Sequence, residues 1–376
     1  MKQQYLYTPG PVTVPPEVLL DLAYPIYHHR TAKFRSLFGE VNAKLKQVFR
    51  TRNDVLTFTS SGTGAMEASV VNFLSPGDKV MTINGGKFGE RWTGLAKAFG
   101  LAATEVKLDW GTAPDPRQIA SLLAADPAIQ AVYATLTETS TGTLYDIAAL
   151  GSVVARTNAL LVVDAISGLG ADEMRTDDWQ VDVCVAGSQK ALMIPPGLAF
   201  MSVSDKAWKM AEASKLPKYY FNAVKARKSL AKDDTPYTPA LTLVRALNVA
   251  LNMIAEETVD AVIARHARLA AAVRQGVLAL GLKLYSQRPS NALTAVLVPE
   301  TVDAGKIISV LKEEGVFVAE GQDAAKGRIF RVAMMGYATE ADVVNALSAI
   351  ERAMKKLGIP FDPSAGVAAA QRSLLA

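Results

Sequence analysis

Cysteine is almost absent from this sequence, because its 376 residues contain only Cys184. A single thiol excludes a disulfide framework and any zinc or iron–sulfur centre built from several cysteines. Histidine is nearly as scarce, with His28 and His29 adjacent and His266 far along the chain. We therefore predict no metal site of either kind.

The sequence also lacks a strong net charge and a long hydrophobic run. Forty Lys and Arg against 36 Asp and Glu leave a net charge of +4, too small to indicate a nucleic-acid or membrane surface. Apolar runs such as ALLVVDA are shorter than a membrane span, and the opening MKQQYLYTPGPV has no apolar core of a signal peptide. Because half of the residues are hydrophobic, we expect a folded, cytoplasmic enzyme without nucleic-acid or membrane partners.

Short apolar runs alternate with helical patterns over the first two-thirds of the chain. Continuous apolar runs fit strands buried on both faces of a mostly parallel sheet, whose ligands bind at the carboxyl ends of the strands. After about Thr235 the pattern changes to long helices and short strands. We predict an α/β fold with a large domain over residues 1–255, N-terminal segment included, and a smaller α+β domain over residues 256–376.

Two polar motifs follow predicted strands in the first half of the chain. The run from Ser60 to Gly64 (SSGTG) lies between a strand and a helix, where free backbone N–H groups can hold a phosphate. It has neither the Walker nor the dinucleotide spacing, and an ordinary capped turn is the alternative. Asp164 ends the run LLVVD, where its carboxylate can pair with a cationic ring nitrogen or begin a turn.

Two cations lie in equally apolar surroundings. Lys190 follows the run DVCVA through Gly187-Ser188-Gln189, and a lysine at the mouth of a sheet can lose its proton and act as a nucleophile or base. Arg331 lies inside the run IFRVAMM, so it needs a carboxylate partner from the protein or from a substrate. A phosphate-binding turn, an acid for a ring nitrogen, a nucleophilic lysine and a carboxylate-binding arginine together are what pyridoxal phosphate chemistry requires.

The chain resembles the class V aminotransferases of fold type I, in particular the alanine/serine–glyoxylate or –pyruvate group. The resemblance runs from Thr8 to about Gly336 and implies the pyridoxal phosphate-dependent transferase fold, with pyridoxal 5′-phosphate as cofactor. The motifs that carry it are SSGTGAMEA (60–68), NGGKFGERW (84–92), TETSTG (137–142), VVDAIS (162–167), GSQKAL (187–192), TPYTPAL (235–241) and GRIFRVAMMG (327–336).

The resemblance implies a role for each matching residue. Lys190 is the catalytic residue, which joins the cofactor covalently and carries the proton, and Asp164 bonds the ring nitrogen. Phe88 stacks on the ring face, and Thr139 approaches the ring edge. Arg331 binds the substrate carboxylate.

The remaining matches concern the phosphate and the substrate side. Gly62, Thr63 and Gln189 bind the phosphate, and Gly10 lines the substrate side with its backbone. Thr238 matches a position that reaches the phosphate of the neighbouring subunit's cofactor, which implies a homodimer with a shared active site.

The expected reaction moves the amino group of alanine or serine to glyoxylate or pyruvate, because only one strand-embedded arginine is apparent. An aspartate donor needs a second cation, which the basic segment 215–232 could supply, and a phosphonate-bearing amine makes the same demand. A catalytically silent cofactor-binding subunit is a further alternative. A nicotinamide dehydrogenase is a poor alternative, because the sequence lacks the glycine fingerprint of dinucleotide-binding proteins. The buried setting predicted for Cys184 argues against a cysteine desulfurase.

Overall fold

A seven-stranded sheet forms the centre of the large domain in the computed structural model, which describes residues 4–376. All strands run parallel except β10, which lies antiparallel between β2 and β9. Every residue of β8, β9 and β10 is buried, which confirms the predicted sheet with both faces covered. The spatial order is β2 (Val55–Thr59), β10 (Leu198–Val203), β9 (Val183–Gly187), β8 (Leu160–Asp164), β5 (Ile129–Thr135), β3 (Lys79–Asn84) and β4 (Ala102–Lys107).

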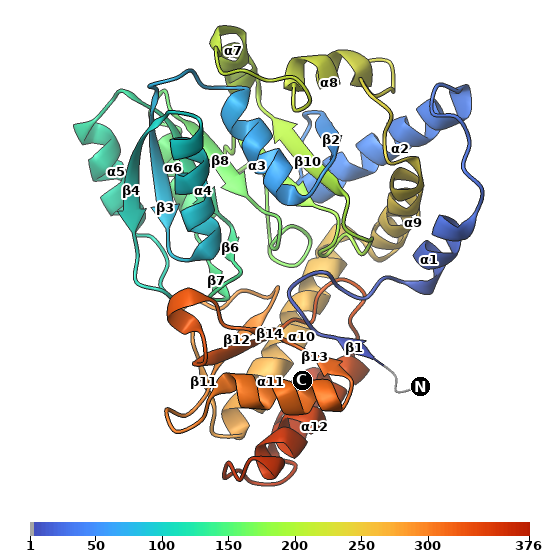
Figure 1. Cartoon of the computed structure of the whole chain (residues 1–376), viewed down its shortest axis with the longest axis vertical. Helices are drawn as coiled ribbons and strands as arrows, with labels where there is room; N and C mark the ends of the chain where they lie inside the picture. The colour runs from blue at the N-terminus through green and yellow to red at the C-terminus, as the bar shows by residue number, and fades with distance from the viewer. Residues whose placement is uncertain (1–3) are drawn as a thin grey trace.

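The helices of the large domain share one hydrophobic core with this sheet (Figure 1). Five of them begin at a Ser, Thr, Asp or Asn whose side chain accepts a hydrogen bond from the first turn. Helices α3 and α4 begin without such a cap, and both are used by the site described below. The helices are α1 (Pro16–Ala23), α2 (Ala32–Phe49), α3 (Gly62–Val71), α4 (Lys87–Ala98), α5 (Pro116–Ala125), α6 (Ile147–Val154), α7 (Asp205–Ala213), α8 (Ala223–Leu230) and α9 (Leu241–Glu257).

The small domain contains a four-stranded antiparallel sheet and a second hydrophobic core. Helix α10 (Val259–Ala279) joins the domains, since Val262 belongs to the first core and Leu269 to the second. The α+β character of this region is confirmed, and the boundary at residue 256 stays a prediction. The other elements are β11 (Lys283–Leu284), β12 (Thr294–Leu297), α11 (Ala304–Glu313), β13 (Val316–Phe317), β14 (Ala319–Glu320), η1 (Asp323–Ala325), β15 (Ile329–Val332), α12 (Glu340–Lys356) and α13 (Ala365–Leu375).

The first strand, β1 (Tyr5–Leu6), lies on the small domain and pairs parallel with β13 (Figure 1). Tyr7 packs into the small-domain core, and its hydroxyl donates a 3.1 Å hydrogen bond to Asp342. The expectation that the N-terminal segment belongs to the large domain is therefore wrong for residues 5–7. The physical reason is that a two-residue strand forms its backbone hydrogen bonds with whichever strand has an unpaired edge nearby. Two residues are too few for the sequence to indicate which strand that is.

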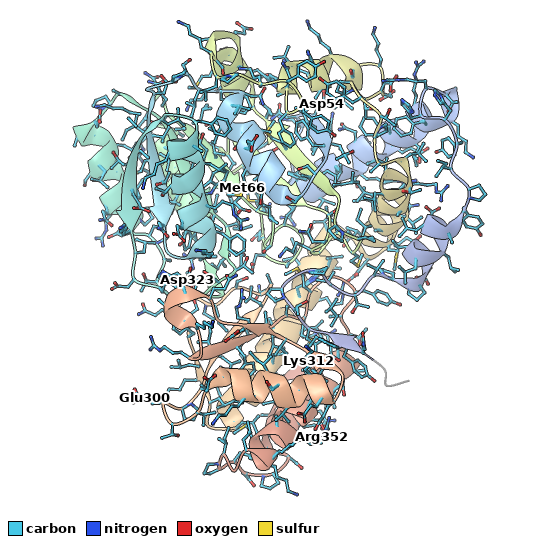
Figure 2. All side chains as sticks on the ribbon, viewed as in Figure 1. Asp54, Met66, Glu300, Lys312, Asp323 and Arg352 are labelled. Carbon is cyan, nitrogen blue, oxygen red and sulfur yellow. The ribbon has the colours of Figure 1, made fainter. Side chains whose placement is uncertain are left out.

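The two domains meet through several polar contacts, both buried and exposed. Asp172 of the large domain is buried and accepts hydrogen bonds from the hydroxyl of Ser290 (2.5 Å) and the N–H of Asn291 (2.8 Å) in the small domain. Figure 2 shows Asp323 on the small domain where it approaches the large one, and Lys87 of α4 pairs with it at 2.8 Å. Within residues 4–376, none of the helices has the length and apolar character that a membrane crossing requires.

Candidate active site between the two domains

Several of the predicted site residues are brought together at the carboxyl ends of β8 and β9. Asp164 ends β8, and Gln189 and Lys190 follow the end of β9. The side chain of Ile166 fills the space between these strand ends and α3, because a Cβ on Gly62 would lie 2.5 Å from its terminal methyl group. A larger residue at position 62 would have to displace the Ile166 side chain, so the first turn of α3 lies against the strand ends.

Lys190 is almost fully buried, and its Nζ donates a hydrogen bond to the carbonyl oxygen of Pro9. The neighbouring Gly10 has a φ of +106°, and a Cβ there would lie 2.5 Å from Nζ. Burial lowers the pKa of Lys190 to about 8, with Asp164 opposing the shift and Arg331 adding to it. The amine is therefore poised to release its proton close to neutral pH.

Asp164 is buried beside this amine with one backbone partner for its carboxylate. Its Oδ1 accepts a 2.8 Å hydrogen bond from the N–H of Ile166. Burial raises the pKa of Asp164 to about 6, while that hydrogen bond and the positive charge of Arg91 act in the opposite direction. A cationic nitrogen bound next to this carboxylate would favour its ionised form.

Neither α3 nor α4 is capped by the residue that precedes it, but the two helices differ in what occupies their first turns. At α4, the buried carboxylate of Glu138 accepts hydrogen bonds from the backbone N–H groups of Phe88 and Gly89. At α3, Ser61 precedes the helix without a side-chain hydrogen bond to the first turn, and the side-chain amide oxygen of Gln189 is buried without a partner. The first turn of α3 therefore keeps backbone N–H donors without a side-chain acceptor, and such donors suit an anionic ligand.

Arg331 on β15 brings a buried positive charge from the small domain. Its guanidinium donates to the carbonyl oxygens of Glu320 (3.1 Å from Nε and 2.7 Å from Nη2) and Thr139 (2.8 Å from Nη1). Among the described residues it has no acidic side chain as an ion-pair partner. Burial lowers its pKa, but a guanidinium stays charged at neutral pH. The sequence left open a protein carboxylate or a substrate carboxylate as its partner, and the first is absent among the described residues.

Phe88 donates its backbone N–H to the carboxylate of Glu138, and Thr139 follows Glu138 in the chain. Phe88 is half-buried in the first turn of α4, and Thr139 is buried with its hydroxyl donating to Ser167 at 2.7 Å. Through its carbonyl oxygen Thr139 also contacts Arg331, so this loop connects the two domains. Burial raises the pKa of Glu138, while its hydrogen bonds to Ser140 and to the first turn of α4 counteract that effect.

Sequence reasoning missed Glu138, which forms part of this site as the cap of α4. The sequence does contain an acidic residue between threonines in TETSTG. Nothing in that pattern indicates that the Glu138 carboxylate accepts hydrogen bonds from a helix that begins about 50 residues earlier. Thr238 differs from the other predicted residues: it is exposed and makes no side-chain hydrogen bond within residues 4–376. The basic segment 215–232 lies on the large domain around α8.

The described residues fit a phosphorylated pyridine aldehyde. A buried amine of lowered pKa can join the aldehyde, and a buried carboxylate beside it can pair with the ring nitrogen. The N–H groups in the first turn of α3, which lack a side-chain cap, suit the phosphate. Within residues 4–376, no cluster of three or more His, Cys, Asp or Glu side chains could hold a metal ion.

Comparison with known proteins finds two relatives named as aminotransferases and one named as a hydrogenase subunit. The chain is 42% identical to the soluble hydrogenase 42 kDa subunit of Anabaena cylindrica, over 98% of this chain and 97% of that protein. It is 36% identical to the L-aspartate–glyoxylate aminotransferase of Paracoccus denitrificans (98% and 96% covered) and 35% identical to the serine–glyoxylate aminotransferase of Methylorubrum extorquens (99% and 96%).

A solved aminotransferase structure has the same overall fold as this chain. The pyridoxamine–pyruvate aminotransferase of Mesorhizobium loti superposes with a TM-score of 0.95 at 30% identity, covering 100% of this chain and 97% of that one. Residues 8–346 match the family described as Aminotransferase class-V. With the buried lysine, acid and guanidinium in place, the cofactor is pyridoxal phosphate and the reaction is amino-group transfer, and the chain belongs to the class V aminotransferases.

Proposed function

We propose that this aminotransferase takes its amino group from a small amino acid, alanine or serine, and passes it to glyoxylate or pyruvate. The observation that carries the proposal is the bonding of Arg331. Three of its N–H groups donate to carbonyl oxygens, and a guanidinium has five. One N–H therefore remains on each terminal nitrogen, which suits the two oxygens of an α-carboxylate.

A donor with a second carboxylate needs a second cation, and the basic segment does not favour one. Lys218 donates hydrogen bonds to the carbonyl oxygens of Val71, Ser214 and Leu216. The charged groups of Lys225 and Arg227 lie over the aromatic rings of Tyr219 and Trp208. These three cations already have partners, so they do not favour a second carboxylate. Aspartate therefore ranks second as a donor, and the 36% identity to the L-aspartate–glyoxylate aminotransferase is what keeps it as an alternative.

The site residues have the following proposed roles. When bound, pyridoxal phosphate supplies an aldehyde that joins amines and a ring that accepts electrons from them. Lys190 holds and moves the proton at Nζ, within reach of the Pro9 carbonyl. Asp164 bonds the ring nitrogen, and Arg331 orients the substrate by its carboxylate, while Gly10 leaves room for Nζ.

The phosphate and the ring face have their own residues in this proposal. Gly62 and Thr63 offer the backbone and side chain of the first turn of α3, and Gln189 offers the N–H groups of its side-chain amide, which are donors to an anion. Phe88 stacks on the ring, and Thr139 lies at its edge.

We also propose a homodimer, in which Thr238 serves the partner's site. Four large apolar side chains that are exposed within eight residues, on and after α1, support it, because such exposed groups are often covered in a contact surface. These residues are Leu19 (51% exposed), Leu20 (66%), Tyr24 (65%) and Ile26 (72%). Light scattering during gel filtration tests the dimer, and a monomer at micromolar concentration contradicts it. The cytoplasmic location stays a prediction from the sequence.

A donor and acceptor panel tests the substrate proposal. Purified enzyme with its cofactor is mixed with L-alanine, L-serine or L-aspartate, and the change in cofactor absorbance is followed before glyoxylate or pyruvate is added. We expect kcat/KM for alanine or serine to exceed that for aspartate by at least about 10-fold, since an unpaired second carboxylate costs more than 1.4 kcal/mol on burial. A preference for aspartate contradicts the proposal, and a cofactor that responds to no donor favours the silent subunit.

A further inference from the structure

A cation that the proposed roles do not use lies within the site. Arg91 is on α4 three residues after Phe88, so both side chains project from the same face of the helix. Its guanidinium carbon lies over the Phe88 ring, 4.8 Å from the ring centroid. Among the described residues, no acidic side chain forms an ion pair with Arg91.

The second contact of Arg91 reaches α3. Its Nη1 donates a 3.0 Å hydrogen bond to the hydroxyl oxygen of Thr63, in the first turn of that helix. Because this bond occupies the oxygen of the hydroxyl, the O–H hydrogen of Thr63 points elsewhere, and no other hydrogen bond of this hydroxyl occurs within residues 4–376. The hydroxyl is therefore a donor that lacks an acceptor among the described residues.

We propose that Arg91 is a positioning residue for pyridoxal phosphate, which directs the Thr63 hydroxyl toward the cofactor phosphate and braces the Phe88 ring against which the cofactor lies. A charged donor on the oxygen of Thr63 polarises its O–H, and a polarised O–H is a stronger donor to an anion. One guanidinium thus couples the phosphate contact to the ring contact.

The charge of Arg91 acts in the same direction as this geometry. It lowers the pKa of Asp164 and that of Lys190, which favours an ionised acid and a neutral amine. The inference rests on the cofactor and not on the proposed donor. An enzyme that binds pyridoxal phosphate but prefers aspartate would contradict the proposed donor and leave Arg91 untouched.

The test measures cofactor affinity rather than activity. Enzyme freed of cofactor is titrated with pyridoxal phosphate and, separately, with pyridoxal, which lacks the phosphate. The variants are Arg91→Met, Thr63→Val and the double variant, with Lys97→Met as the control because Lys97 is an exposed cation on the same helix. Circular dichroism and the melting temperature without cofactor report whether each variant folds.

We expect each single variant to bind pyridoxal phosphate about 10- to 100-fold more weakly, the effect of one charge-assisted hydrogen bond. The double variant should bind no more than about twofold more weakly than the single variant with the lower affinity. The reason is that both changes break the same contact, which runs from Arg91 through the Thr63 hydroxyl to the phosphate. Pyridoxal affinity should change by a smaller factor, and Arg91→Lys should recover part of the loss.

Three results would overturn the inference. One is an unchanged affinity for pyridoxal phosphate in folded Arg91→Met. Another is a double variant whose loss equals the product of the two single losses. The last is an equal loss for pyridoxal and pyridoxal phosphate, which would remove the phosphate from the explanation. If Arg91→Met does not fold, Thr63→Val and Arg91→Lys decide the same question, and full affinity in both contradicts the inference.

Discussion

Replacing Arg331 by methionine is the most direct test of how the substrate is held. The change keeps an unbranched side chain of similar length and removes the guanidinium, which donates to Glu320 and Thr139. Truncating one partner of a buried, hydrogen-bonded charge pair costs about 2–5 kcal/mol. Taking roughly 3–4 kcal/mol, we expect kcat/KM for the amino donor to fall about 150- to 1000-fold, mainly through KM.

The free energy of unfolding changes in two opposing ways in this variant. The carbonyl oxygens of Glu320 and Thr139 lose their donors, which costs about 1–3 kcal/mol each, but a buried charge also disappears. Arg331→Lys keeps a charge without the fork of two N–H groups, so its loss of kcat/KM should be intermediate.

The assay is a steady-state measurement of alanine or serine with saturating glyoxylate, together with cofactor occupancy by absorbance. Arg328→Met is the matched control, because Arg328 is exposed three residues earlier, and its kcat/KM should stay within about threefold of wild type. A kcat/KM of Arg331→Met within about fivefold of wild type, with full cofactor occupancy, would refute the substrate role and leave Arg331 as a structural residue.

Three further outcomes are expected. Lys190→Ala should fold but lose turnover by about 10⁴-fold or more, and wild-type rates, or a borohydride-reduced cofactor found by mass spectrometry on another residue, would end its assignment. Without cofactor, Lys190→Met should be more stable than wild type by roughly 3 kcal/mol below pH 8. The reason is that the folded protein holds this amine at a pKa of about 8 against an ordinary 10.5. The difference in unfolding free energy between the variant and wild type should therefore shrink as pH rises from 8 to 10.5. A difference in urea unfolding that does not change with pH argues against this explanation. Asp172→Asn should lower the free energy of unfolding by about 1–3 kcal/mol, because Asp172 accepts hydrogen bonds from Thr137, Ser290 and Asn291 at the domain junction, and an unchanged urea midpoint counts against that role.

Strand positions were the part of the fold that the sequence predicted best. The apolar run LLVVD that precedes the site coincides with β8, and the run DVCVA is shifted by one residue from β9. These strands are buried on both faces, so their runs are continuous and easily recognised. Strand β4 (Ala102–Lys107) was not expected, because it lies at the sheet edge and Val106 is its only buried residue.

The sequence by itself determined the fold class, the family and the residue types of the site, because buried strands and their terminal polar residues are local patterns. Only the tertiary structure decided how those residues are bonded. The capping of α4 by Glu138, the contacts of Arg91 with Phe88 and Thr63, and the closeness of Gly10 to Lys190 all join segments distant in the chain. Such contacts depend on the packing of whole elements against one another, and the free energy that selects them is shared among many residues.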